Sequence, residues 1–307
     1  MNGNLPVVIL GADPELFIFD QKKERLSSAI AFFPKGKNSG EFVTQEAGAR
    51  VLHDNVAVEF NCRPYGTAVE FANGMSSILG GIQQMLTERA SETHRLVYDV
   101  GSAVFPPQLL RHREAKRFGC EPDFSAWTSM RNPTHDAETV GNLRVIGGHI
   151  HVGLRGASKL VDALLRDFTT SCAIVKLLDA TLGQYIASLE AASPVPSTFV
   201  DRRKFYGASG AFRKKPYGLE YRTPSSIWLS SRESMEKVFN IVNGVLSKVD
   251  DADNQHEYTP DQIMLRGNTL PLYRELLKKF DVIEDEVITA VNTSVPNKEL
   301  LKYALSF

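Results

Sequence analysis

Cysteine is scarce in this sequence, which holds only Cys62, Cys120 and Cys172, far apart along the chain. An odd number of widely spaced cysteines cannot form a disulfide framework or a cysteine-rich zinc site. Disulfide-stabilised secreted domains are therefore excluded, and a reducing compartment is the simpler interpretation.

Excess charge and long apolar runs are also missing. The 35 basic and 36 acidic residues give a net charge of −1, so nothing favours a nucleic-acid-binding surface. No stretch approaches the roughly 18 apolar residues that a membrane span needs. The first residues lack the basic segment and the long apolar segment of a signal peptide. We expect a cytoplasmic protein that binds neither nucleic acid nor membrane.

Pairs of polar residues separated by one residue are the most informative feature that is present. Because side chains alternate between faces along a strand, residues i and i+2 point the same way. Carboxylates and imidazoles crowded on one face are unfavourable unless metal ions or a bound polyanion absorb the charge. The pairs are Asp13 with Glu15, Glu59 with Asn61, His149 with His151, and Glu220 with Arg222.

Each pair taken alone has a plainer explanation. The two histidines could be satisfied within a strand, Glu220 and Arg222 could form a surface ion pair, and residues 11–15 could form a turn. The combination instead favours an active-site face. Its acids and imidazoles suit divalent cations with oxygen-rich shells, such as Mg²⁺ or Mn²⁺, and an arginine there suits bidentate binding of a phosphate.

Two basic clusters are candidate phosphate-binding segments. Lys35 opens a glycine-containing loop at residues 35–40, which lacks the Walker A pattern. Residues 190–217 are predicted to be a basic loop whose cations neutralise a triphosphate, with a merely solvated loop as the alternative. The candidate ligands in this second segment are Arg202, Arg203, Arg213 and Lys215.

The apolar patterns predict an α+β fold with a largely antiparallel sheet. The long Val/Ile runs of a parallel sheet are missing. Apolar stripes at helical spacing predict helices from Thr67 to about Arg89 and from Ser158 to about Leu189. No linker is evident, so residues 1–307 are predicted to be one domain with a helical C-terminal extension at about 231–307. The predicted strands are residues 7–10, 16–19, 29–33, 56–60, 96–100, 143–154 and 218–222.

The order of these motifs resembles that of the glutamine-synthetase-like carboxylate–amine ligases. An acidic pair is followed by the Glu59 strand, then by Gly-Gly-His-x-His-x-Gly, then by Leu-Glu-x-Arg. The resemblance is closer to the phage-encoded type-two carboxylate–amine ligases, or amidoligases, and spans roughly residues 7–230. The segments that carry it are residues 11–17, 55–64, 118–124, 147–153 and 206–228.

This resemblance implies a glutamine-synthetase-like catalytic domain, with helices on the outer face of a curved antiparallel sheet. It implies ATP and Mg²⁺ (or Mn²⁺) as cofactors, an acyl-phosphate intermediate, and a small-molecule or peptide carboxylate and amine as substrates. Arg222 would stabilise the transferring phosphoryl group, with Glu59 and His151 also in catalytic roles. The implied metal ligands are Asp13, Glu15, Glu59, His149 and Glu220.

One departure concerns the first acidic pair, which is Asp-Pro-Glu where better-known ligases have Glu-x-Glu. The shorter Asp13 side chain favours contact with a metal through water. The resemblance also makes a homo-oligomer an open possibility, and it implies the host cytoplasm if the protein is phage-encoded.

Two other functions compete with the ligase hypothesis. A metal-dependent amidohydrolase also uses a His-x-His strand, but its site needs further histidines, and only His256 follows His151. A nucleotide- or metal-binding protein without turnover would be the non-enzyme alternative. The retained acids, histidines and arginine argue against it.

Overall fold

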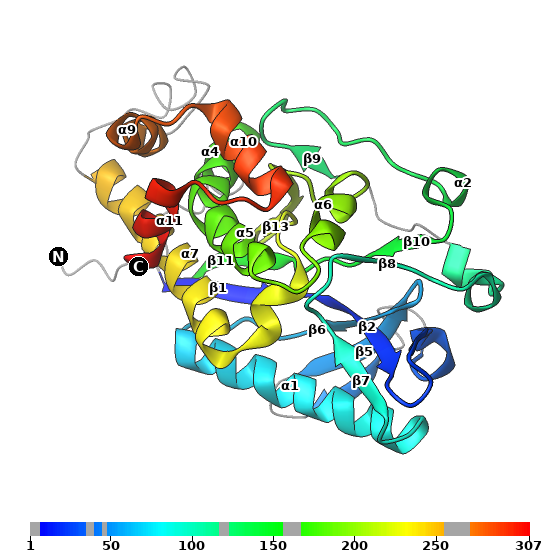
Figure 1. Cartoon of the computed structure of the whole chain (residues 1–307). Coiled ribbons are helices and arrows are strands. Elements are labelled where there is room, and N and C mark those ends of the chain that lie inside the picture. Colours follow the sequence, from blue (N-terminus) through cyan, green and yellow to red (C-terminus); the bar gives the residue numbers. More distant parts are fainter. Residues whose placement is uncertain (1–6, 35–39, 45–47, 117–122, 156–166, 255–270) are drawn as a thin grey trace.

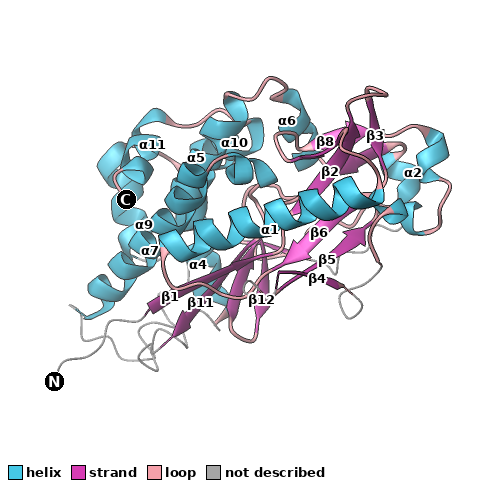
Figure 2. Ribbon diagram, turned by 90° about the horizontal axis from the view of Figure 1, so that it is seen from below, coloured by secondary structure: helices cyan, strands magenta, loops and turns pink. Residues whose placement is uncertain are grey.

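Two antiparallel sheets form the framework of the molecule (Figures 1 and 2). The computed structural model describes residues 7–34, 40–44, 48–116, 123–155, 167–254 and 271–307. Every strand pairing in it is antiparallel, so the predicted α+β class with an antiparallel sheet is confirmed.

The first sheet has five strands in the order β1-β11-β13-β12-β9, and the second is built on β3-β2-β6-β5-β4, with β7 also paired to β2. A third, two-stranded sheet pairs β8 with β10. The bounds in the first sheet are β1 Val7–Ala12, β11 Ile150–Arg155, β13 Gly218–Tyr221, β12 Ala211–Lys215 and β9 Phe124–Ser125. The others are β2 Glu15–Asp20, β3 Arg25–Ser27, β4 Glu41–Thr44, β5 Ala49–Asp54, β6 Ala57–Asn61, β7 His94–Val97, β8 Ser102–Val104 and β10 Leu143–Val145.

The chain passes directly from the first sheet to the second. Strand β1 ends at Ala12 and β2 begins at Glu15, so only Asp13 and Pro14 lie between them. The Glu15 amide donates to the carbonyl of Gly147 at 2.8 Å, and the Phe60 amide donates to the carbonyl of Pro14 at 3.3 Å. Both sheets therefore contribute side chains to the region around this crossing.

Helices cover these sheets. The predicted helix after Thr67 is confirmed as α1 (Ala68–Arg89), where the Thr67 hydroxyl accepts a hydrogen bond from the Glu70 amide. Its stripe of buried residues excludes Val69, which is 54% exposed. The remaining helices are α2 Ala137–Val140, α4 Phe168–Leu178, α5 Gln184–Ala191, α6 Ser197–Arg203, α7 Arg232–Asn254, α9 Pro271–Phe280, α10 Glu284–Thr293 and α11 Lys298–Leu305, with 3₁₀ turns at Ala29–Ala31, Pro107–Leu110, Glu114–Lys116 and Ser226–Ser230.

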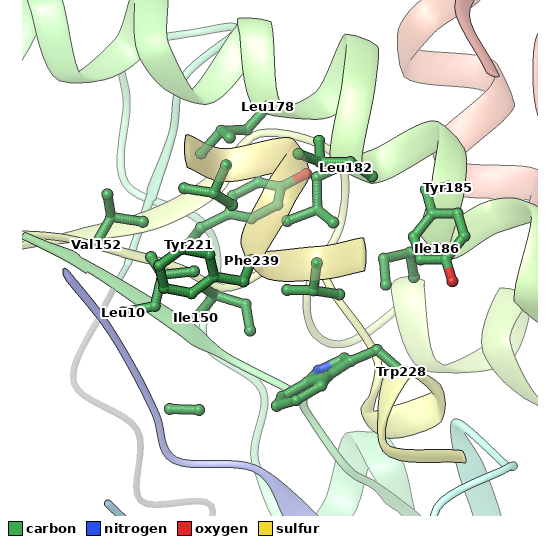
Figure 3. Packing of buried hydrophobic residues seen from close by; sticks show 14 of the residues in the cluster. Leu10, Ile150, Val152, Leu178, Leu182, Tyr185, Ile186, Tyr221, Trp228 and Phe239 are labelled. Atoms are coloured by element: carbon green, nitrogen blue, oxygen red, sulfur yellow. The ribbon is translucent and has the colours of Figure 1, made fainter. Parts of the chain in front are cut away.

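The main core lies between the first sheet and the helix that runs from Phe168 to Ala191. This helix includes a π-helical segment, Asp179–Gly183, between α4 and α5. Figure 3 shows Ile150, Val152 and Tyr221 of the sheet packed with Leu178 and Leu182 of the helix, and all five are buried. Because side chains alternate along strands, the intervening residues of β11 and β13 face the opposite side.

The Phe168–Ala191 helix is also long and apolar enough to cross a membrane by composition. In the structure, 83% of its apolar window is buried within the protein. Its hydrophobicity is therefore explained by its place in the core.

Three sequence-based element predictions are corrected. Residues 29–33 were expected to form a strand but hold the 3₁₀ turn Ala29–Ala31. Residues 143–154 form two strands, because β10 ends at Val145 and the backbone of Gly147 and Gly148 pairs with Glu15 and Pro224 before β11 begins. A Cβ atom on Gly148 would lie 2.3 Å from the carbonyl oxygen of Ser225, so a side chain would not fit there.

The third correction concerns residues 190–217, which were expected to be a basic loop. They contain α6 and β12, and Arg202 is completely buried. Its guanidinium donates to the carbonyl oxygens of Ile146 at 2.6 Å, Thr223 at 2.8 Å and Pro224 at 3.0 Å, and also to those of Arg222 and Gly207. Arg202 therefore ties backbone segments together, and this geometry replaces its expected role in binding a triphosphate.

Replacing Arg202 with lysine tests this assignment. Lysine keeps the charge but cannot reach the same carbonyl groups with a planar fork. Leaving buried acceptors unsatisfied should lower the free energy of unfolding by on the order of 3 kcal/mol, measured by urea denaturation. The control is Lys204→Ala, an exposed residue whose ion pair with Asp201 contributes little. Unchanged stability combined with weaker ATP binding would restore the phosphate-binding role.

Candidate active site

The candidate site lies on the face of the first sheet that points away from the core helix. In the pairing register, Gly11 is opposite His151, His151 is opposite Glu220, and Glu220 is opposite Arg213. Side chains at directly opposed positions of neighbouring strands share a face and lie close together. His151, Glu220 and Arg213 therefore form a row across β11, β13 and β12, and the row begins beside Asp13.

Among the described residues, Asp13, His151 and Glu220 form a group that could hold a metal ion. Their ligand atoms all lie within 4.8 Å of one another. The His151 Nε2 atom lies 2.9 Å from Asp13 Oδ1, and its Nδ1 atom contacts the Tyr217 hydroxyl. Two carboxylates and an imidazole held by a second partner are a donor set that fits a divalent cation.

His149 lies beside the same carboxylates. Its Nδ1 atom is 3.2 Å from Asp13 Oδ1 and 3.7 Å from Glu220 Oε1, while its Nε2 atom is 2.9 Å from the Tyr206 hydroxyl. Burial and the nearby Arg222 charge lower the pKa of His149 to about 4. The imidazole is therefore neutral at pH 7, which is the state that binds a metal.

The position of the His149 imidazole also explains a glycine of the Gly-Gly-His motif. A Cβ atom on Gly147 would lie 2.3 Å from His149 Nε2 and 3.0 Å from the Tyr206 ring. Glycine at this position leaves room for the imidazole to reach the Tyr206 hydroxyl.

The carboxylates of this group are held in their charged form. Burial alone would raise the pKa of Asp13, but its hydrogen bonds with His149 and His151 outweigh burial and hold the pKa well below its usual value. Burial is likewise outweighed at Glu220, where His149, Arg222 and Lys215 lower the pKa to about 2. Charged carboxylates are the form that cations bind.

Three basic side chains surround Glu220. Lys215 Nζ lies 2.7 Å from Glu220 Oε2, Arg213 Nη1 lies 3.6 Å from the same atom, and Arg222 Nη1 donates to Oε1. Lys215 and Arg213 retain some exposure, with 23% and 14% of their side chains accessible. Both expected phosphate ligands on β12 are thus brought to the candidate site, on the side where an anion could approach them.

Arg222 is buried and held by three partners. Besides Glu220, its Nε atom donates to Asp123 Oδ2 at 3.0 Å and its Nη2 atom donates to the Tyr206 hydroxyl. Neither Asp123 nor Tyr206 was named as a site residue from the sequence. Both lie within segments that carry the family resemblance, residues 118–124 and 206–228. The resemblance of these segments was the one signal in the sequence that could have identified the two residues.

Glu15 and Glu59 form a second acidic pair on the neighbouring sheet. They are directly opposite each other on β2 and β6, and both are buried. The Gly147 amide donates to Glu15 Oε2 at 2.7 Å. Burial and the charges of Asp54 and Glu59 raise the pKa of Glu15 well above its usual value. A cation between the two carboxylates would relieve this repulsion, so the pair fits the role expected from the sequence.

Two other expected phosphate ligands are not brought to this face. The Arg203 guanidinium lies 2.7 Å from the buried carboxylate of Glu190 and donates to the Ser294 hydroxyl at 3.0 Å. It is thus engaged with α5 and with the end of α10, as Arg202 is with backbone carbonyls. Lys35 lies outside the described residues.

The geometry predicts that both imidazoles contribute to cation binding. His149→Ala and His151→Ala should each weaken Mn²⁺ binding by at least about 10-fold, because each removes a donor beside Asp13. Titration of Mn²⁺ followed by electron paramagnetic resonance measures this without turnover. The control is His112→Ala, at an exposed position outside the group. If both variants bind Mn²⁺ as the wild type does, the histidines are not ligands.

Residues 142–285 match a family model described as phage phiEco32-like COOH-NH2 ligase type 2. The matched segment includes His149, His151, Glu220 and Arg222 of the site, whereas Asp13, Glu15 and Glu59 lie before it. A search of curated proteins found no match. The family name denotes a ligase that joins a carboxylate to an amine. The match confirms the resemblance found in the sequence: over residues 142–285, this chain is similar to the phage-encoded type-two carboxylate–amine ligases.

Proposed function

We propose that this protein is an ATP- and Mg²⁺-dependent carboxylate–amine ligase of the glutamine-synthetase-like type, acting in the cytoplasm. The observation that carries the proposal is the juxtaposition of Asp13, His151 and Glu220 with Arg213, Lys215 and Arg222 on one sheet face. A donor set for a divalent cation next to several basic groups suits a nucleotide triphosphate bound with its metal. The family match supplies the reaction class.

The reaction proceeds in two steps. A substrate carboxylate oxygen attacks the γ-phosphorus of ATP, the bond from that phosphorus to the β,γ-bridging oxygen breaks, and ADP leaves. The amine nitrogen then attacks the carbonyl carbon of the acyl phosphate, the carbon–oxygen bond to phosphate breaks, and inorganic phosphate leaves. The nitrogen loses a proton as the amide forms. ATP thus converts a poor leaving group into a good one.

The residues of the site divide between these tasks. Asp13 and Glu220, with His149 and His151, would hold one cation, and Glu15 with Glu59 would hold another. When bound, divalent cations neutralise phosphate charge and polarise the phosphoryl group. Arg213 and Lys215 would bind phosphate oxygens from β12. Arg222 would turn from Glu220 to the transferring phosphoryl group, where its planar fork matches two oxygens.

Turnover of ATP across pooled carboxylates and amines tests the proposal most directly. Release of ADP and phosphate that requires both a carboxylate and an amine is the expected result. Hydrolysis of an amide without ATP would instead favour the amidohydrolase. Nucleotide or metal binding with no turnover in any pool would favour the binding protein.

ATP binding should depend on Mg²⁺ or Mn²⁺. Without a cation, the carboxylates of Asp13, Glu59 and Glu220 would repel a triphosphate at short range. Calorimetry with Mg²⁺ and with EDTA should show ATP binding at least about 10-fold weaker in EDTA. Equal affinity under the two conditions would contradict a metal-bridged nucleotide.

Arg222→Lys separates a ligase from a hydrolase. Lysine retains the charge but loses the planar fork that stabilises a phosphoryl group mostly in the transition state. We expect kcat for ADP release to fall by roughly 10²-fold, with a much smaller change in the Kd of ATP. Thermal unfolding of the variant checks that the buried site still folds. Amide hydrolysis that is independent of ATP and insensitive to this substitution would overturn the ligase assignment.

A further inference from the structure

A two-residue turn carries Tyr217 over the row of candidate site residues. Strand β12 ends at Lys215 and β13 begins at Gly218, and these two residues are paired with each other, so only Pro216 and Tyr217 lie between the strands. Because so short a connection has little conformational freedom, the backbone position of Tyr217 follows from the pairing of the two strands. The tyrosine is 46% exposed, yet its hydroxyl contacts His151 Nδ1.

Two facing glycines make room for this turn. Gly153 of β11 is paired with Gly218 of β13, and the pair of His151 and Glu220 lies two residues away along each strand, on the same face. Gly218 has a φ angle of +150°, and a Cβ atom on it would lie 2.2 Å from a carbonyl oxygen of β11. A Cβ atom on Gly153 would lie 3.3 Å from the Tyr217 carbonyl oxygen. The last glycine of the Gly-Gly-His-x-His-x-Gly motif therefore lets the turn lie against β11.

Tyr217 holds the His151 ring at one face and at one edge. The two rings are stacked, with their centroids 5.9 Å apart and their planes inclined by 26°. The hydroxyl contacts Nδ1, while Nε2 on the other edge of the imidazole lies 2.9 Å from Asp13 Oδ1. The stack restricts tilting of the imidazole and the hydroxyl restricts its rotation. Together they direct Nε2 toward the group that His151 forms with Asp13 and Glu220.

A hydroxyl group suits both positions of the imidazole hydrogen. A neutral imidazole carries one hydrogen on nitrogen, and a ring that binds a cation through Nε2 must carry that hydrogen on Nδ1. The Tyr217 hydroxyl can then accept it. Where Nε2 instead donates to Asp13, the same hydroxyl can donate to Nδ1. A carboxylate could only accept and an ammonium group could only donate, so neither would serve in both arrangements.

We propose that Tyr217 is a positioning residue for a divalent cation. It orients His151 and holds the imidazole hydrogen on Nδ1, which leaves the Nε2 lone pair for a cation bound together with Asp13 and Glu220. The proposal rests on the cation site of the proposed function and adds a residue that acts through His151 without binding the cation itself. The hairpin that carries the expected phosphate ligands on β12 would thereby also set the geometry of a cation ligand on β11.

Tyr217→Phe tests the hydroxyl while keeping the stacked ring. Titration of Mn²⁺ followed by electron paramagnetic resonance should show binding about 10-fold weaker than in the wild type, since a hydrogen-bond partner of a metal-ligating histidine is lost. The matched control is Tyr303→Phe, which removes the hydroxyl that accepts from Lys248 Nζ at 3.0 Å on a partly exposed tyrosine of α11. The control should bind Mn²⁺ as the wild type does. Equal affinity in Tyr217→Phe and the wild type would overturn the proposal.

A double-mutant cycle determines whether the hydroxyl acts through His151. In His151→Ala, the further change Tyr217→Phe should alter Mn²⁺ affinity by less than about 2-fold, because the side chain that it positions is gone. In His149→Ala, the same change should keep its effect of about 10-fold. A loss as large in the His151→Ala protein would also overturn the proposal, since the hydroxyl would then act on the cation or the carboxylates directly.

Long-range ¹H–¹⁵N NMR spectra of the Mg²⁺-loaded protein locate the imidazole hydrogen independently of affinity. A hydrogen on His151 Nδ1 is expected, and a hydrogen on Nε2 would contradict the proposal. None of these measurements needs turnover. Weaker Mn²⁺ binding by Tyr217→Phe with no ATP turnover in any substrate pool would therefore reject the ligase function alone. ATP-dependent ligation with unchanged Mn²⁺ binding by Tyr217→Phe would reject the positioning role alone. A wild-type protein that binds no Mn²⁺ would reject both.

Discussion

The buried guanidinium of Arg202 ties together three backbone segments that each carry a site residue. Ile146 precedes the turn to His149, Gly207 follows Tyr206, and the Arg222–Pro224 carbonyls follow Glu220. Carbonyl oxygens of separate loops do not converge without a shared hydrogen-bond donor. A single planar donor with fixed geometry makes them converge, so His149, Tyr206 and Arg222 meet because Arg202 lies behind them.

A second buried group fixes the same region from the helix side of the sheet. Asp179, in the π-helical segment, accepts hydrogen bonds from the Ser209 hydroxyl, the Trp127 indole at 2.9 Å and the Tyr221 hydroxyl. Tyr221 lies between Glu220 and Arg222 and faces the core. Asp179 therefore fixes the position of Tyr221 on the core face of β13. Glu220 and Arg222, on either side of Tyr221, point to the candidate site on the opposite face. π-helical turns are often found at functional sites, and here the turn places a carboxylate under the active-site strand.

The predictable parts of this structure depended on local signals. The alternation of polar and apolar residues gave the shared face of His149 and His151, and the Thr67 cap gave the start of α1. The role of Arg202 could not be predicted, because its partners are backbone carbonyls far away in the sequence, and an arginine beside glycines also suits a phosphate loop. Asp123 and Tyr206 were missed for the same reason: their contacts with Arg222 depend on how distant segments pack. The break in residues 143–154 reflects backbone hydrogen bonds of Gly147 with Glu15 and of Gly148 with Pro224, which no local pattern contains.

The crossing from β1 to β2 has a consequence for the size of ligand that the site can accept. Asp13 belongs to the group on the first sheet and Glu15 to the pair on the second, and a single proline joins them. Proline locks its φ angle, and both polar atoms of the Pro14–Glu15 peptide group are hydrogen-bonded to other segments. The span between the two acidic groups is therefore set by covalent geometry and cannot adapt to the ligand. Cations bound by the two acidic groups would therefore lie at a fixed separation, and the proposed triphosphate would have to match that separation.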